Sequence, residues 1–238
     1  MCKYGFVRHS LVDYPGEVCG VIFMPGCNLC CPYCHNRTLS EDVAKNGYSL
    51  TAIKEYLTTA KRLITGVCIT GGEPTLQPQK LFDLITFLRA IDLKIKLDTN
   101  GTCPEILEEL DVGGKNSFAE RVDVNYLAMD LKTTPEKYRY LVRVDTKGIE
   151  DKVVQSIEII SRRPVGTYEF RTTLDWAVVQ VDDIKTMGQY LPKDAHWYFQ
   201  PCRQQGTNIR LTPYSDKDHI EKILSEARNY TPNVFLRG

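Results

Sequence analysis

Four cysteines occupy positions 27–34 of this 238-residue chain, and their spacing predicts a metal site. Cys27, Cys31 and Cys34 follow a C-x3-C-x2-C pattern, and Tyr33 precedes the last of them. Four-iron clusters usually take four protein thiolates. A loop with three thiolates therefore predicts a four-iron cluster with one iron open to a small-molecule ligand. Cys30 falls outside the spacing, and we expect it not to be a ligand.

Two other chemistries use parts of the same loop. The run CPYC at 31–34 is the C-x-x-C motif of dithiol oxidoreductases, which does not need Cys27. The pairs Cys27–Cys30 and Cys31–Cys34 resemble zinc knuckles, although such pairs are normally separated by about 12–20 residues. Buried or disulfide-bonded cysteines are a further alternative. The cluster is the favoured interpretation, and the alternatives stay open here.

A glycine pair follows the next predicted strand in the run TGGEPT at 70–75. Gly71 and Gly72 allow the backbone to approach a ligand closely, because they carry no side chain. Glu73 adds a carboxylate at the same place. A plain strand-to-helix turn is the alternative interpretation.

Three more polar residues are predicted within or at the ends of later strands. Asp98 and Asp130 supply carboxylate oxygens, which are the ligands a hard cation prefers, although both also suit ordinary strand ends. Arg171 stands in an apolar strand, where an inward guanidinium needs an anion. An outward, solvated Arg171 is the alternative.

Strands and helices alternate six times along the chain, which predicts an α/β fold of parallel β-α units. The expected strands are 17–24, 66–70, 94–99, 122–131, 168–174 and 196–200. The expected helices are 49–62, 79–91, 104–110, 152–160, 183–190 and 216–228. We expect one domain over 1–238, with a cluster loop at 24–37, a mobile insertion at 111–120 and a variable C-terminal segment at 201–238.

These motifs together resemble the radical S-adenosylmethionine (radical SAM) superfamily. The resemblance implies a partial (β/α)6 TIM-like barrel, a 4Fe-4S cluster on the three cysteines and SAM on the open iron. It implies that SAM is cleaved reductively to a 5′-deoxyadenosyl radical. It also implies SAM contacts at the residues Tyr33, His35, Gly71, Gly72, Glu73, Asp98, Asp130, Arg171 and Gln200, with a monovalent cation beside the two aspartates.

The runs at 10–16 (SLVDYPG), 23–29 (FMPGCNL) and 34–36 (CHN) narrow the resemblance. They are similar to the activating proteins of anaerobic ribonucleoside-triphosphate reductase, in the branch related to pyruvate formate-lyase activase. This implies a glycyl radical enzyme as partner and a flavodoxin- or ferredoxin-type electron donor. The alternative within the superfamily is a small-molecule enzyme similar to 7-carboxy-7-deazaguanine synthase.

Charge and hydrophobicity limit the remaining functional classes. Lys plus Arg equals Asp plus Glu at 30 each, so the overall charge predicts neither nucleic-acid nor membrane binding. No apolar run reaches the roughly 20 residues of a membrane span. The N-terminal residues lack the pattern of a secretory signal, and nine cysteines suit a reducing compartment. We therefore expect a cytoplasmic enzyme.

Overall fold

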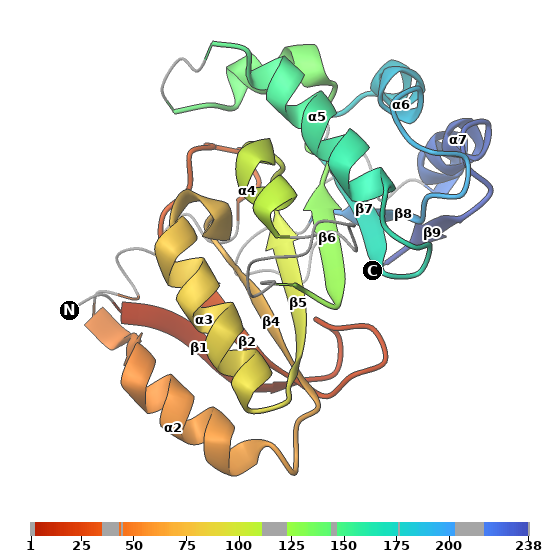
Figure 1. Cartoon of the computed structure of the whole chain (residues 1–238). Coiled ribbons are helices and arrows are strands. Elements are labelled where there is room, and N and C mark those ends of the chain that lie inside the picture. The colour runs from red at the N-terminus through yellow and green to blue at the C-terminus, as the bar shows by residue number, and fades with distance from the viewer. Residues whose placement is uncertain are drawn as a thin grey trace. The chain divides into compact units, whose positions relative to one another are not determined.

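The chain divides into two compact units. Figure 1 labels the helices and strands. The computed structural model describes residues 3–34, 43, 45–110, 123–143, 147–175, 177–202 and 217–237. Unit 1 comprises Met1–Asn28, Asn36–Thr99 and Glu105–Leu127, and unit 2 comprises Leu29–His35, Asn100–Pro104 and Ala128–Gly238.

Unit 1 is built on strands in the order β3-β1-β2-β4-β5. The strands β2, β4 and β5 run parallel, whereas β1 pairs antiparallel with both β2 and β3. β2 is buried along nearly its whole length, as expected for an apolar parallel strand that is covered on both faces. The bounds are β1 (Lys3–Ser10), β2 (Cys19–Met24), β3 (Tyr48–Ser49), β4 (Gly66–Gly71) and β5 (Lys94–Thr99).

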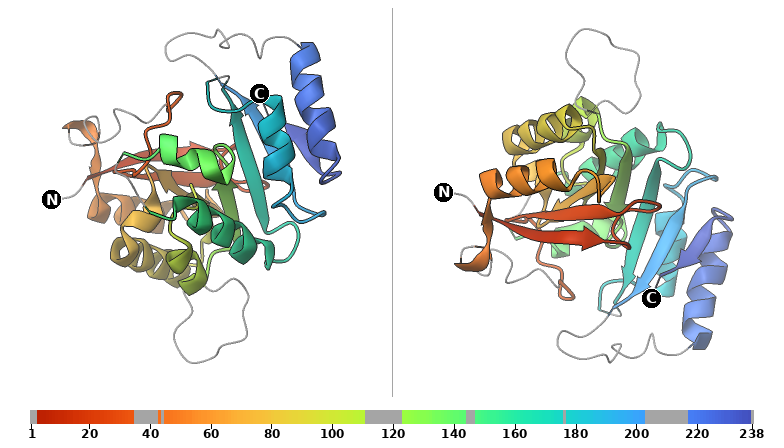
Figure 2. Two further views of the ribbon diagram at one scale, coloured as in Figure 1. Left: turned by 90° about the horizontal axis from the view of Figure 1, so that it is seen from above. Right: turned by 90° about the horizontal axis from the view of Figure 1, so that it is seen from below.

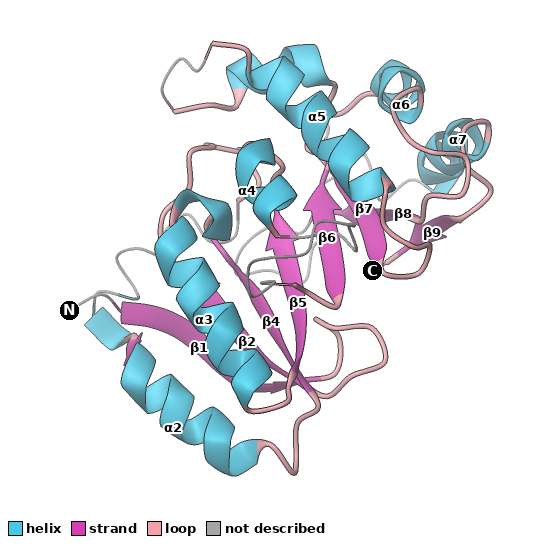
Figure 3. Cartoon of the chain, viewed as in Figure 1, coloured by secondary structure: helices cyan, strands magenta, loops and turns pink. Residues whose placement is uncertain are grey.

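Helices follow the strands of unit 1, and Figure 3 shows the alternation by colour. Ser49 caps the first of them by accepting a 3.1 Å hydrogen bond from the amide of Ala52. Each of the two long helices buries one apolar face, for example Ile53 and Leu57 in α2. The bounds are α2 (Leu50–Ala60), η1 (Pro74–Leu76), α3 (Pro78–Ala90) and α4 (Pro104–Glu109).

β6 (Tyr126–Asp130) begins in unit 1 and ends in unit 2. Unit 2 continues with parallel strands in the order β7-β8-β9, and α6 packs against α7 (Figure 2). Burial alternates at the end of β7, where Phe170 and Thr172 are buried and Arg171 and Thr173 are half-buried. The bounds are η2 (Pro135–Tyr140), α5 (Ile149–Ser161), β7 (Tyr168–Leu174), α6 (Val181–Gly188), β8 (Trp197–Pro201), α7 (Lys217–Arg228) and β9 (Val234–Leu236).

The α/β class predicted from the sequence is confirmed. Each of the twelve expected elements has a counterpart, and the strands expected at 94–99 and 168–174 match β5 and β7 residue for residue. The strands β1, β3 and β9 were not expected. The insertion predicted at 111–120 lies outside the described residues, and the single-domain expectation for 1–238 stays a prediction. In the described part of the chain, no helix has the length and apolar character needed to cross a membrane.

Candidate functional site

The glycine pair at the end of β4 is bonded to the residues that lead into the cysteine loop. Gly72 donates its amide to the carbonyl of Met24 at 2.8 Å, and Glu73 donates to the carbonyl of Gly26 at 2.7 Å. The side-chain amide of Gln77 reaches the carbonyl of Pro25 at 2.7 Å. The backbone immediately before Cys27 is therefore held in place by the segment from Gly72 to Gln77.

Both glycines are sterically required in this arrangement. A Cβ at position 72 would lie 1.9 Å from the carbonyl oxygen of Gly26. Gly71 has a φ of +122°, and a Cβ there would lie 2.4 Å from the amide nitrogen of Met24. Any side chain would separate the two segments, so the glycines are required for this contact between backbones. The close approach to a ligand stays a prediction.

Glu73 presents a fixed, buried carboxylate and is only 1% exposed. Its Oε1 accepts hydrogen bonds from the amide of Thr75 (3.1 Å), the hydroxyl of Thr75 (2.6 Å) and the hydroxyl of Thr99 (2.8 Å). These donors hold the side chain in one orientation. A buried carboxylate favours a cationic ligand, and the ammonium group of SAM has that charge.

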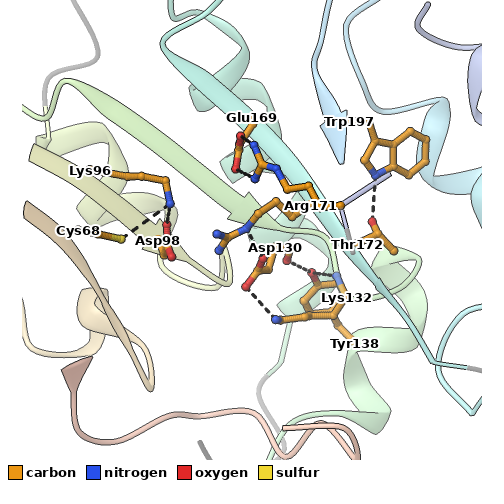
Figure 4. Close-up of polar contacts among 11 residues, drawn as sticks. Cys68, Lys96, Asp98, Asp130, Lys132, Tyr138, Glu169, Arg171, Thr172 and Trp197 are labelled. Carbon is orange, nitrogen blue, oxygen red and sulfur yellow. Dashed lines mark hydrogen bonds and ion pairs between the residues drawn. The ribbon is translucent and has the colours of Figure 1, made fainter. Parts of the chain in front are cut away.

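Asp98 lies at the end of β5 and pairs with the ammonium of Lys96 (Figure 4). Lys96 is only 2% exposed, and its Nζ also lies 3.8 Å from Sγ of Cys68. The carboxylate that was predicted to face a cation therefore already carries an ammonium partner. Sequence reasoning missed Lys96, although its position two residues before Asp98 places both side chains on one face of the strand.

The cysteine loop is divided between the two units. Cys27 belongs to unit 1, whereas Cys31 and Cys34 belong to unit 2. A turn connects the latter two, since the amide of Cys34 donates to the carbonyl of Cys31 at 3.1 Å. None of the three forms a disulfide, so their sulfurs supply the donor type of an iron–sulfur cluster.

Cys30 has different surroundings from the other thiols of the loop. It is exposed, and both its amide (2.7 Å) and its Sγ (3.2 Å) donate to the carbonyl of Leu141. Arg143 donates from Nε to the carbonyl of Leu29 at 3.2 Å. The segment after η2 thus holds the loop by the backbone at positions 29 and 30, and these contacts agree with a non-ligand role for Cys30.

A charge cluster surrounds Asp130 in unit 2 (Figure 4). Its Oδ1 lies 2.8 Å from Nε of Arg171, and its Oδ2 lies 2.9 Å from Nζ of Lys132. Burial alone would raise the pKa of Asp130, but the charges of Arg171 and Lys132 outweigh it and hold the pKa well below its ordinary value. The same contacts raise the pKa of Lys132 against the opposing effect of burial. The three groups therefore stay charged.

Tyr138 connects this charge cluster to the cysteine loop, and sequence reasoning missed it. Its hydroxyl accepts from the amide of Lys132 at 2.9 Å and donates to the carbonyl of Asp130 at 3.1 Å. The side chain is fully buried. Three residues further on, Leu141 accepts the hydrogen bonds from Cys30.

The remaining predicted contacts to SAM are placed less closely together. Tyr33 is half-buried, and the ammonium of Lys132 lies 5.8 Å from the centroid of its ring. Gln200 is half-buried on β8, in register with Thr173 of β7. His35 lies outside the described residues. The structure thus groups Tyr33, Asp130 and Arg171 in unit 2 and the residues Gly71, Gly72, Glu73 and Asp98 in unit 1.

Comparison with known proteins decides the family. The model of the radical SAM superfamily matches residues 21–174. The chain belongs to the radical SAM superfamily. Its enzymes use a 4Fe-4S cluster and SAM, and these are the cofactors of this protein. The glycine segment allows close backbone approach, and the loop supplies thiols of the donor type that a cluster takes. Among the described residues, no group of three or more His, Cys, Asp or Glu side chains is placed to hold a metal ion.

A relative covers this radical SAM protein almost completely. The "Putative glycyl-radical enzyme activating enzyme MJ1227" of Methanocaldococcus jannaschii is 31% identical over 240 residues, or 98% of this chain and 94% of the relative. By contrast, a 7-carboxy-7-deazaguanine synthase of Hyperthermus butylicus is 32% identical over 91 residues, or 38% of each chain. The protein is therefore a radical SAM enzyme of the glycyl-radical-enzyme activase type, and the synthase is a more distant relative.

A solved structure supports the fold of this radical SAM protein. A domain of pyruvate-formate lyase-activating enzyme from Bacteroides vulgatus superposes with a TM-score of 0.51 at 19% identity, covering 73% of this chain and 99% of that one. At this identity the likeness concerns the fold alone. It confirms the predicted partial TIM-barrel type.

Proposed function

We propose that this protein installs a glycyl radical on anaerobic ribonucleoside-triphosphate reductase. The observation that best supports the activation chemistry is the hydrogen bond from the Glu73 amide to the Gly26 carbonyl. Through it, the residue with the buried carboxylate contacts the start of the cysteine loop. The near-complete relative supports a glycyl radical enzyme as partner. The choice of the reductase rests on the motifs at 10–16, 23–29 and 34–36.

In this proposal Cys27, Cys31 and Cys34 would hold the cluster. When bound, the cluster would supply one electron for the cleavage of SAM to methionine and a 5′-deoxyadenosyl radical, which would take a hydrogen atom from a glycine Cα of the partner. No side chain of the chain needs to act as a general base. The protein's contribution is to bind, orient and exclude water.

The SAM molecule would be oriented through its charged ends. Glu73, fixed by Thr75 and Thr99, would accept the ammonium, with the backbone of Gly71 and Gly72 beside it. Arg171 would pair with the carboxylate. The local charge supports this role, because the guanidinium of Arg171 and the ammonium of Lys132 lie together at Asp130.

Other assignments complete the proposal. Tyr33, His35 and Gln200 would contact the adenosine part of SAM, as the family resemblance implies. A monovalent cation near Asp98 and Asp130 would have to share those carboxylates with Lys96 and Lys132. The electron would come from a flavodoxin- or ferredoxin-type donor, and the reaction would take place in the cytoplasm.

The partner is tested by electron paramagnetic resonance. The cluster-loaded, reduced protein would be mixed anaerobically with SAM and, in parallel, with anaerobic ribonucleotide reductase, pyruvate formate-lyase or a pterin substrate of the deazaguanine synthase type. The proposal predicts a glycyl radical signal with the reductase, abolished by Cys34→Ala in the activating protein. A signal with pyruvate formate-lyase alone would reassign the partner. Turnover of the pterin without any glycyl radical would favour the small-molecule alternative.

A further inference from the structure

A second ion pair lies on β7, two residues before Arg171. Both carboxylate oxygens of Glu169 pair with the guanidinium of Arg237, each at 2.7 Å. Glu169 is 0% exposed, whereas the Arg237 side chain is 30% exposed. This is the bidentate geometry in which arginine binds carboxylates most strongly.

Arg237 is held in position independently of Glu169. It follows directly after β9, and its amide donates to the carbonyl of Phe199 on β8 at 2.9 Å. Its guanidinium carbon lies 3.5 Å from the centroid of the Tyr198 ring, a close cation–π contact. β9 therefore positions this guanidinium beside β7.

Glu169 and Arg171 share one face of β7, because side chains two residues apart in a strand point to the same side. Arg237 pairs with Glu169, whereas Asp130 pairs with both Arg171 and Lys132. These two groups of ion pairs together contain three positive and two negative side chains.

We infer that Arg237 is a positioning residue for Arg171: by pairing with Glu169, it leaves Arg171 directed at Asp130 and able to receive the SAM carboxylate. This inference rests on the proposed role of Arg171 in binding SAM. Without Arg237, the buried carboxylate of Glu169 would need another cation, because an unpaired charge in that environment is strongly disfavoured. Arg171 lies on the same strand face and would supply it.

The test is a double-variant series in the full chain. SAM affinity would be measured by equilibrium dialysis on the cluster-loaded protein, and thermal unfolding would be followed on the protein before loading. Arg237→Gln should weaken SAM binding by about tenfold. Adding Glu169→Gln in the same chain should restore affinity to within about threefold, because the competing carboxylate is gone. Glu169→Gln alone should change SAM affinity little.

Two further variants separate this inference from the proposed function. Arg171→Gln should weaken SAM binding when Arg237 is present and should add little in the Arg237→Gln chain, because Arg237 acts through Arg171. Arg139→Gln is the control, because Arg139 also lies over a tyrosine ring, 4.9 Å from the ring centroid of the exposed Tyr140. It should change neither the SAM affinity nor the unfolding temperature. The unfolding temperature of Arg237→Gln should fall, and the double variant should recover part of that loss.

The outcomes are distinguishable. If the double variant binds SAM as weakly as Arg237→Gln, Arg237 does not act through Glu169 and the inference is wrong. If Arg171→Gln weakens binding but Arg237→Gln does not, the inference fails while the proposed role of Arg171 stands. If Arg171→Gln has no effect on SAM affinity, that proposed role fails and the inference fails with it.

Discussion

The amide of Glu73 donates a 2.7 Å hydrogen bond to the carbonyl of Gly26, the residue before Cys27. This contact joins two motifs that are distant in sequence, since Glu73 follows Cys27 by 46 positions. It fixes the backbone at the start of the cysteine loop relative to a carboxylate that is itself held by Thr75 and Thr99. The residues that lead into the loop, 24–26, and the glycine segment therefore form one local structure within unit 1.

Gly72→Ala should destabilise that local structure. The new Cβ would meet the Gly26 carbonyl oxygen at 1.9 Å, so the two segments must separate and lose their hydrogen bonds. We expect a loss of about 1–3 kcal/mol in the free energy of unfolding, measured by chemical denaturation. The matched control is Gly20→Ala in β2, where the nearest atom, Cδ2 of Leu57, lies at an ordinary 3.4 Å. Equal losses in the free energy of unfolding for the two variants would contradict a close contact between Gly72 and Gly26.

Alanine substitutions in the cysteine loop should divide into two groups. Cys27→Ala, Cys31→Ala and Cys34→Ala should each lose the iron and the visible absorption of the cluster after anaerobic reconstitution. Cys30→Ala should keep both, because its thiol is exposed and donates to the Leu141 carbonyl. Loss of the cluster in the Cys30 variant, with retention in one of the other three, would show that the ligand set is wrong.

Tyr138→Phe should loosen the connection between the end of β6 and the cysteine loop. The substitution removes a buried hydroxyl that serves both the Lys132 amide and the Asp130 carbonyl. We expect the free energy of unfolding to fall by about 1–3 kcal/mol. The control is Tyr140→Phe, since Tyr140 is 70% exposed. A structural role limited to stability would leave the electron paramagnetic resonance spectrum of the loaded cluster unchanged, whereas a link to the loop should alter it.

Asp130 should make stability depend on pH in the acid range. Its pKa is lower in the folded chain than its ordinary value of about 4, because Arg171 and Lys132 stabilise the charged form against the opposing effect of burial. Its contribution is therefore complete above about pH 4 and is lost as the pH falls through the folded value. The difference in unfolding free energy between the native chain and Asp130→Asn should shrink below about pH 4. If this difference in unfolding free energy stays constant as the pH falls, the pairing of Asp130 with Arg171 and Lys132 is not its source.

Local pattern was enough to predict most of the parallel α/β framework. The strand at 94–99 alternates polar and apolar residues, and the apolar positions of α3 recur at helical spacing. The motif at 70–75 predicted the glycine segment, because close backbone approach needs residues without side chains. The three-residue strand β9 carries too short a pattern to be recognised.

The partners of the predicted residues were harder to foresee. Lys96 reads as an ordinary polar residue of a strand, and only the fold shows that its ammonium is buried against Asp98. Tyr138 lies in a six-residue 3-10 helix, which is too short to show a repeating apolar pattern. Arg237 reaches Glu169 across 68 positions of sequence, a pairing set by β9 rather than by any local motif. Such contacts depend on strand order and register.

The most direct test of the central claim is a label-transfer measurement. The cluster-loaded protein would be reduced anaerobically and mixed with SAM and a glycyl radical enzyme, anaerobic ribonucleotide reductase first, in which glycine carries deuterium at Cα. The account predicts 5′-deoxyadenosine that contains deuterium, formed together with a glycyl radical on the partner. If 5′-deoxyadenosine forms without deuterium and no partner radical appears, the chain does not act on that glycine. Absence of any SAM cleavage with an intact cluster would contradict the radical activity itself.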